Sequence, residues 1–239
     1  MSDVVVQGRP LPPVVSKDEW ERARAELLAE EKEHMRRGDA LAAKRRRLPM
    51  VPVERQYAFQ GPSGEVSLID LFQGRSQLIV YRFMFHPDWD EGCDGCSWFV
   101  DGLADLRHLA ARDVSLVLVS RAPLPKLEAY KRRMGWDVPW FSSYNTTFNW
   151  DFQATVGDSE HHRLSVFLRD ADKAFLTYQT GERGVEALGT TFSLLYLVPY
   201  GRQEDWEDSP PGWPQGERYV WWRRHDEYHT GVPAPSLRR

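Results

Sequence analysis

Residues 75–96 read RSQLIVYRFMFHPDWDEGCDGC, and this stretch decides the fold. Its first part, Gln77 to Phe85, is a nearly continuous apolar and aromatic run that only Arg82 interrupts, as expected of a central strand covered on both faces. Cys93 and Cys96 follow, and they are the only two cysteines in 239 residues. A spacing of three puts both side chains on one face of a first helical turn, so the sulfurs can meet or separate with little backbone movement. The pattern predicts a dithiol or disulfide site between a strand and a helix.

The composition is that of a globular chain, with 41% hydrophobic and 13% aromatic residues. A net charge of -4 with mixed signs gives no reason to expect a nucleic-acid partner, although Lys44 to Arg47 is a short basic run. No apolar stretch approaches the roughly 20 residues of a membrane span, and residues 1–13 lack the pattern of a secretion signal. We therefore expect a cytoplasmic protein without a membrane partner. In that compartment a single cysteine pair more often serves catalysis, redox sensing or metal binding than structure.

An N-terminal helical arm precedes the domain. Ser16 and Glu19 form a capping-box signature, which predicts that a helix begins there. Gly38 is predicted to end this helix, before a second helical piece that Asp39 caps and that runs to Arg46. The apolar positions of the arm recur at helical spacing: Trp20, Ala23, Leu27, Leu28 and Met35. Such a stripe needs a covering surface, which is either the following domain or a second copy of the chain, so a homodimer through this helix is one of two expectations.

From Tyr57 onward the pattern predicts a compact domain of alternating strands and helices. A hairpin is expected from 57–60 and 65–68, around the turn at 61–64. The further expected elements are a helix over 97–112, a strand over 114–120, a helix over 123–135, an extended segment at 138–142, strands over 164–169 and 174–179, and a closing helix over 190–197. Beyond Pro199 the chain is rich in Pro, Gly, Trp and acid, which predicts an irregular wrapping tail. The chain is thus divided into an arm, 1–50, a domain, 51–200, and a tail, 201–239.

This order of elements matches the thioredoxin-like fold, in which parallel strands joined by a helix precede an antiparallel hairpin and a final helix. The stretch at 75–96 also resembles a bacterial thioredoxin-like group, the domain-of-unknown-function family 899. Three further motifs fit the same group: SRAP at 120–123, KLEAYKRRMGW at 126–136 and RHDEY at 224–228. The resemblance implies an α/β fold with a central mixed sheet flanked by helices and a redox site at the cysteines. It assigns no substrate.

Thiol chemistry proceeds through the thiolate, which the positive end of a helix favours. Cys93 is expected at the very start of the helix, so that it attacks a disulfide or an oxidised substrate and Cys96 resolves the mixed disulfide. Four nearby carboxyl groups oppose this by raising the thiol pKa: Asp88, Asp90, Glu91 and Asp94. Thioredoxin carries Trp before its first cysteine and Gly-Pro between the pair, where this chain has Gly92 and Asp94-Gly95.

The sequence before the cysteines also resembles that of peroxiredoxins, at Phe85-His86-Pro87. However, no Thr or Ser stands between Pro87 and Cys93 to orient a peroxide. The first hypothesis is therefore a thiol-disulfide or peroxide-type oxidoreductase. It would act on a small-molecule or protein thiol or disulfide substrate, and we expect no cofactor.

Other residues are expected at the same edge of the sheet. His86 either transfers a proton near Cys93 or is an ordinary histidine at a strand end. Arg121 follows a strand and either holds a substrate carboxylate, stabilises the thiolate, or pairs with the acid cluster. Three tryptophans are candidate ligand-binding walls: Trp89, Trp98 and Trp140. The aromatic and charged run at 221–228 either lies over the cysteine edge as a lid or covers apolar surface only.

Three alternatives to a redox site stay open. The cysteines could hold zinc together with a histidine, for which the candidates are His86, His161, His162 and His225. They could also be packed thiols without reactivity. Finally, the chain could be a non-catalytic binding protein that uses its aromatic edge to hold a small molecule or a partner.

Overall fold

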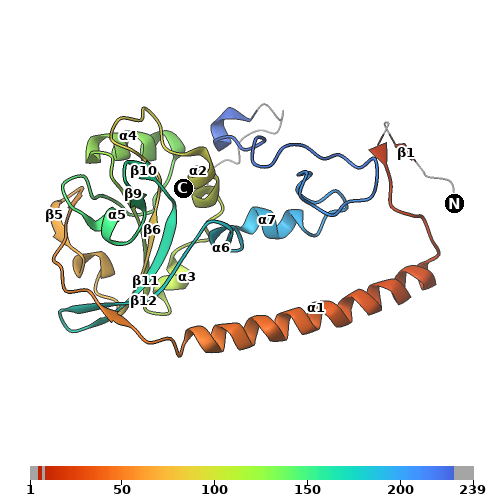
Figure 1. The fold of residues 1–239 in the computed structure, drawn as a ribbon, viewed down its shortest axis with the longest axis horizontal. Coiled ribbons are helices and arrows are strands. Elements are labelled where there is room, and N and C mark those ends of the chain that lie inside the picture. Colours follow the sequence, from red (N-terminus) through yellow and green to blue (C-terminus); the bar gives the residue numbers. More distant parts are fainter. Residues whose placement is uncertain (1–4, 7–8, 229–239) are drawn as a thin grey trace. The chain divides into compact units, whose positions relative to one another are not determined.

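The computed structural model describes residues 5–6 and 9–228 (Figure 1). The chain divides into two compact units, and each is described here by itself. The first combines the residues up to Pro49 with Leu195–Arg218, and the second combines Met50–Leu194 with the segment that begins at Tyr219. The predicted tail is thus shared between the units, because its last described part packs on the helix that follows the cysteines.

In the first unit, α1 is one continuous helix, Lys17–Arg45, drawn in orange in Figure 1. The capping box is confirmed, since the Ser16 side chain accepts the Glu19 amide and the Glu19 carboxylate accepts the Ser16 amide. The predicted stop at Gly38 is wrong. A glycine inside a helix costs only about 1 kcal/mol relative to alanine, and its neighbours Arg36, Arg37 and Leu41 favour the helix. None of the residues of α1 is buried, and dimerisation through it stays a prediction.

The rest of the first unit has little regular structure. Strands β1, Val5–Val6, and β2, Arg9–Pro10, form a short antiparallel pair. The Tyr200 hydroxyl donates to the carbonyl of Pro10 at 2.8 Å. Residues 196–218 contain turns and one isolated bridge, as the composition predicts for an irregular segment.

The second unit is built on an eight-stranded mixed sheet in the order β3-β12-β11-β6-β7-β8-β4-β5. Its strands are β3 Val51–Pro52, β4 Ala58–Gly61, β5 Gly64–Ser67, β6 Gln77–Arg82, β7 Val114–Ser120, β8 Trp140–Ser142, β11 Arg163–Asp170 and β12 Lys173–Gly181. A separate pair consists of β9, Thr155–Val156, and β10, Ser159–Glu160. Strand β6 lies parallel to β7 and antiparallel to β11, which in turn forms the hairpin with β12. This is the predicted thioredoxin-like arrangement, with β6 in the middle.

Short helices connect the strands: η1 Asp70–Phe72, α2 Asp94–Asp101, α3 Arg107–Ala110, α4 Leu124–Met134, α5 Phe148–Asp151, α6 Arg183–Glu186, α7 Thr190–Leu195 and η2 His225–Glu227. The helix predicted over 97–112 is wrong at both ends. It begins earlier, because Cys93 caps it, and it ends at Gly102, after which α3 is a separate turn. The helix predicted over 123–135 is confirmed as α4, which ends with Gly135 in the left-handed conformation.

Both faces of β6 are covered, as its apolar sequence predicts. On one face the ring of Tyr81 contacts Phe99 of α2 at 4.5 Å between centroids, and Phe83, just beyond the strand, contacts Tyr130 of α4. On the other face Val80 belongs to a buried core with Phe148 of α5 and aromatic residues of the β4 and β11 strands. The carboxyl end of β6 is therefore held rigidly, and the cysteines follow it.

Two glycines in helical context test this description in opposite directions. We expect Gly135→Ala to destabilise the second unit by about 1–2 kcal/mol, because a Cβ disfavours the left-handed backbone at φ 66. Gly38→Ala should instead stabilise α1 by about 0.5–1 kcal/mol, because the residue is inside the helix and alanine loses less backbone freedom there than glycine. Nothing lies within 4 Å of an added Cβ at this position. Urea unfolding followed by far-UV circular dichroism measures both, and a change of the same sign at the two positions would contradict the assignment.

Candidate active site

The cysteines lie where β6 ends and α2 begins, as predicted. The Cys93 amide donates to the carbonyl of Met84 at 3.0 Å, which ties the loop back to the strand end. Cys93 is the N-cap residue of α2, and its Sγ accepts the backbone N–H of Cys96 at 3.4 Å. One turn further, the Ser97 amide and hydroxyl both donate to the Cys93 carbonyl. Cys93 is thus fixed on both sides by backbone hydrogen bonds.

The two sulfurs are free thiols in different surroundings. Cys96 is 2% exposed, its Sγ accepts the Met84 amide at 3.5 Å, and it hydrogen bonds with the buried Tyr81 hydroxyl. Cys93 is partly exposed. The two residues of the pair therefore differ in exposure, with Cys93 partly exposed and Cys96 buried.

Their pKa values are displaced in opposite directions. The Cys96 side chain and its backbone N–H both hydrogen bond to the Cys93 sulfur and lower the pKa of Cys93, while burial and the Asp94 carboxylate oppose that shift. Burial raises the pKa of Cys96, and the neighbouring Cys93 adds to the increase. The partly exposed thiol thus has the lower pKa of the two.

The acid cluster affects Cys93 less than its sequence predicts. Asp94 Oδ1 lies 4.0 Å from the Cys93 sulfur and raises its pKa. Glu91, however, is paired with Arg133 and with Arg224, the latter at 3.0 Å. Asp88 is almost fully exposed, so solvent screens it. The hydrogen bonds from the Cys96 side chain and from the backbone N–H groups of Cys96 and Gly95 therefore outweigh the Asp94 carboxylate in setting the pKa of Cys93.

His86 and Arg121 form a polar cluster of their own at the same edge of the sheet. His86 Nε2 lies 3.1 Å from Asp158, and Arg121 Nη1 lies 2.7 Å from the buried carboxylate of Glu160. The Arg121 guanidinium also lies 4.2 Å from the ring centroid of Trp150. His86 Nδ1 accepts the backbone amide of Asp88 at 3.1 Å and lies 3.8 Å from the Asp88 carboxylate. Within residues 5–6 and 9–228, neither side chain has a hydrogen bond or ion pair to a cysteine or to the other acids at 88–94. Their catalytic roles stay predictions.

The predicted tryptophan walls need correction. Trp140 is 1% exposed and donates to the Ser120 hydroxyl, and Trp98 is 8% exposed with Phe192 packed on it at 4.0 Å between centroids. Trp140 packs against Phe83 and Trp136, and Trp98 packs against Phe192 and Trp222, so both are buried and neither presents an open surface to a ligand. Trp89 is 38% exposed, and its contact with a substrate stays a prediction.

The aromatic and charged run near the C-terminus lies on the cysteine helix. We call Tyr219–Tyr228 the C-terminal strap. Its Trp222 stacks on Trp98 with 5.5 Å between centroids and 7° between planes, and its Arg224 donates to the carbonyl of Gly92 at 2.8 Å. The run at 221–228 thus covers apolar surface of α2 and reaches the backbone before Cys93, and its role as a lid over the cysteine edge stays a prediction. The charged motif at 224–228 was the available signal.

The histidines proposed as zinc ligands lie elsewhere. His225 Nδ1 is 2.8 Å from Asp101, and His161 Nδ1 is 4.0 Å from Glu182. Across the described part of the chain, no group of three or more His, Cys, Asp or Glu side chains converges as a metal site would require. Within the described residues, a zinc site at the two cysteines therefore lacks the histidine ligands that it would need.

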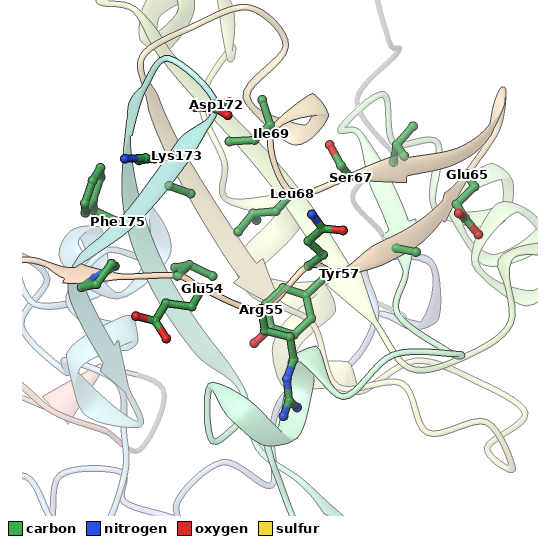
Figure 2. Close-up of a pocket in the computed structure, with 16 residues that line it drawn as sticks. Glu54, Arg55, Tyr57, Glu65, Ser67, Leu68, Ile69, Asp172, Lys173 and Phe175 are labelled. Carbon is green, nitrogen blue, oxygen red and sulfur yellow. The ribbon is translucent and has the colours of Figure 1, made fainter.

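A hollow of about 900 Å³ lies away from the cysteines, between the β4–β5 hairpin, the segment that precedes it and the β11–β12 turn. Figure 2 shows Asp172 and Lys173 on one side of it and Ser67 and Glu65 on the other. Its lining includes Tyr57, whose hydroxyl is bonded to a carboxylate outside the hollow. None of its lining residues comes from α2 or from the carboxyl ends of β6 and β7.

The fold and this site define a thioredoxin-like protein with a Cys-x-x-Cys at a helix start. The chain belongs to the family described as bacterial protein of unknown function (DUF899), whose model matches residues 9–228. No functionally curated protein shows significant similarity to it. Among the described helices, none has both the length and the apolar character needed to cross a membrane.

Several solved structures are distantly similar. Peroxidoxin BcpB from Mycobacterium tuberculosis is 16% identical, with 57% of this chain and 85% of that chain covered and a TM-score of 0.42. A Chlorobium tepidum protein provisionally assigned as the thiol:disulfide interchange protein DsbE is 15% identical, with coverages of 59% and 93% and a TM-score of 0.41. A reduced 2-Cys peroxiredoxin from Plasmodium vivax is 14% identical, with coverages of 59% and 93% and a TM-score of 0.40. We therefore argue the function from the cysteine site itself.

The thiol hydrogen bond makes a testable prediction about the Cys93 pKa. Replacing Cys96 by alanine removes the side-chain donor, so the pKa of Cys93 should rise, whereas Cys96→Ser keeps a hydroxyl donor and should raise it less. The pH dependence of Cys93 alkylation by iodoacetamide, followed by mass spectrometry, measures both, because only the thiolate reacts. Equal midpoints for the two variants would show that the side chain at position 96 does not set this pKa.

Proposed function

We propose that the protein is a thiol-disulfide oxidoreductase in which Cys93 attacks the substrate and Cys96 resolves the mixed disulfide. The observation that carries this proposal is the asymmetry of the pair. Cys93 is partly exposed and has a lowered pKa, whereas Cys96 is buried, has a raised pKa and contacts the Cys93 sulfur through its own side chain and amide. A nucleophile and a resolving group need these two environments.

The reaction balances with the two thiols as the electron source. The Cys93 thiolate attacks one sulfur of a substrate disulfide, an S–S bond forms between them, and the other substrate sulfur leaves as a thiolate that takes up a proton. Cys96 then gives up its proton and attacks the Cys93 sulfur, which releases the second substrate thiol and leaves the Cys93–Cys96 disulfide. The substrate disulfide is reduced to two thiols, and an external dithiol must reduce the enzyme again.

The hydrogen bonds around Cys93 favour disulfide over peroxide as substrate. The Ser97 hydroxyl donates to the Cys93 carbonyl and not to its sulfur. Within the described residues, no Thr or Ser hydroxyl donates to that sulfur, and such a donor would be needed to hold a peroxide beside the thiolate. A disulfide needs no such donor, because the attacked sulfur carries its own leaving group.

Single-cysteine variants test the assignment of roles. With a small disulfide such as cystamine, the native chain should lose the mass of two hydrogen atoms, and a dithiol should restore it. Cys96→Ser should accumulate the mixed disulfide at Cys93, because the resolving thiol is absent. Intact-mass spectrometry measures both.

The matched control is Cys93→Ser, whose remaining thiol is buried and has a raised pKa. It should form a mixed disulfide at least about tenfold more slowly, since buried, protonated thiols are poor nucleophiles. Equal trapping by both variants would reverse or remove the proposed roles, and thiols that stay free in the native chain would exclude the function.

A further inference from the structure

Two groups of the C-terminal strap occupy the backbone on either side of Cys93. On the N-terminal side, Arg224 Nη2 donates to the carbonyl of Gly92. On the C-terminal side, the ring of Trp222 lies against Gly95, so closely that a Cβ there would be 2.5 Å from the ring carbon Cζ3. The backbone on both sides of Cys93 is therefore already in contact with side chains of the strap.

Arg224 also reaches the first turn of α2 through a chain of hydroxyls. Its Nε donates to the Tyr130 hydroxyl at 2.7 Å, and that hydroxyl lies 2.8 Å from Ser97 Oγ. The Tyr130 hydroxyl also lies 3.4 Å from the carbonyl of Gly92, and Ser97 donates its own proton to the Cys93 carbonyl. Arg224 thus holds the carbonyl before Cys93 directly and the carbonyl of Cys93 indirectly.

The strap is kept in place mainly by ion pairs and stacking. Arg133 of α4 pairs with Asp226 at 2.7 Å and with Glu227 at 3.0 Å, and it shares Glu91 with Arg224. These side chains are about one-sixth to one-half exposed, so dissolved salt screens their attraction. The Trp222 ring packs between Trp98 and neighbouring aromatic rings, while its Nε1 is buried and has no hydrogen-bond partner among the described residues. A segment held in this way can lift without unfolding the sheet.

We propose that Trp222 and Arg224 determine specificity, and that they limit Cys93 to small disulfides while the strap is closed. This inference rests on the proposed function and names its substrate class. A protein disulfide reaches an attacking thiolate with chain on both sides of its sulfurs, and it needs free space along the backbone that flanks the nucleophile. Here Trp222 and Arg224 fill that space, and Cys93 keeps only partial access to solvent. A small disulfide needs no more than that access.

The structure also gives a reason for Gly95, where thioredoxin carries proline. The contact with the Trp222 ring leaves no room for a side chain at this position. In Gly95→Ala, the new methyl group should therefore displace the Trp222 ring and with it the strap. This substitution leaves both cysteines and all strap residues unchanged.

The first experiment measures access without redox chemistry. In a Cys96→Ser background, Cys93 is labelled with N-ethylmaleimide and with a maleimide that carries a polyethylene glycol chain, and each rate is divided by the rate of the same reagent with glutathione. The large reagent should be disfavoured in the parent, and Trp222→Ala, Arg224→Ala and Gly95→Ala should each raise the large-to-small ratio about tenfold, as loss of a contact of this size shifts an equilibrium. High salt should raise the ratio in the parent as well, which requires no substitution at the strap.

The matched control is Arg169→Ala. Arg169 lies at the far end of β11, where Leu168 is paired with Gln77 at the start of β6, whereas the cysteines follow the other end of β6. Its guanidinium bonds to the carbonyl of Ala171. The ratio should not change in this variant. Thermal unfolding confirms that each variant is folded. The proposal would be overturned if the large-to-small labelling ratio stayed the same in every folded strap variant and at every salt concentration.

The second experiment uses the native cysteine pair with cystamine and with insulin as disulfide substrates. The native strap should favour cystamine, and the strap variants should raise the insulin-to-cystamine rate ratio about tenfold. Reduction of both substrates with an unchanged ratio would refute the specificity role and leave the proposed function standing. Absence of any exchange, together with a labelling ratio that responds to the strap, would refute the proposed function and leave the strap's control of access standing.

Discussion

The hydrogen bond from the Cys93 amide to the carbonyl of Met84 is the interaction on which the site depends. It ties the loop that leaves β6 back to the end of that strand, and it sets the residue at which α2 can begin. Strand β6 can serve as the support because it is paired on both edges and buried on both faces. The position of Cys93 is thus set by a strand that is paired on both edges and buried on both faces.

The difference between the two thiols follows from that position. At the N-cap, the Cys93 sulfur accepts hydrogen bonds from the Cys96 side chain and from the backbone N–H groups of Cys96 and Gly95, and these favour the thiolate. One turn later, Cys96 points back towards the sheet and meets Tyr81 and the Met84 amide in a dry environment. A single helical turn therefore separates a group that loses its proton easily from one that retains it, although the two side chains are chemically identical.

The charged groups around the site form pairs that no local pattern indicates. Glu91 is close to Cys93 in sequence, yet Arg133 and Arg224 neutralise it, and these come from α4 and from the C-terminal strap. Likewise Arg121 pairs with Glu160 of the β9–β10 pair. The electrostatics of the cysteine helix are therefore decided by residues that lie about 40 to 130 positions away in the chain.

The sequence by itself determined the strand at Gln77, the cysteine pair at a helix start, the α4 helix and the β11–β12 hairpin, because each depends on side-chain periodicity or on local capping and turn residues. It wrongly predicted a helix stop at Gly38 and ligand-binding surfaces at Trp98 and Trp140, because helix propensity and aromatic character do not tell which surfaces are covered. Only the tertiary structure decided that Trp222 and Arg224 lie against the backbone beside Cys93. Contacts between residues so far apart in the sequence follow from the packing of the whole unit, and no period or motif in the chain encodes them.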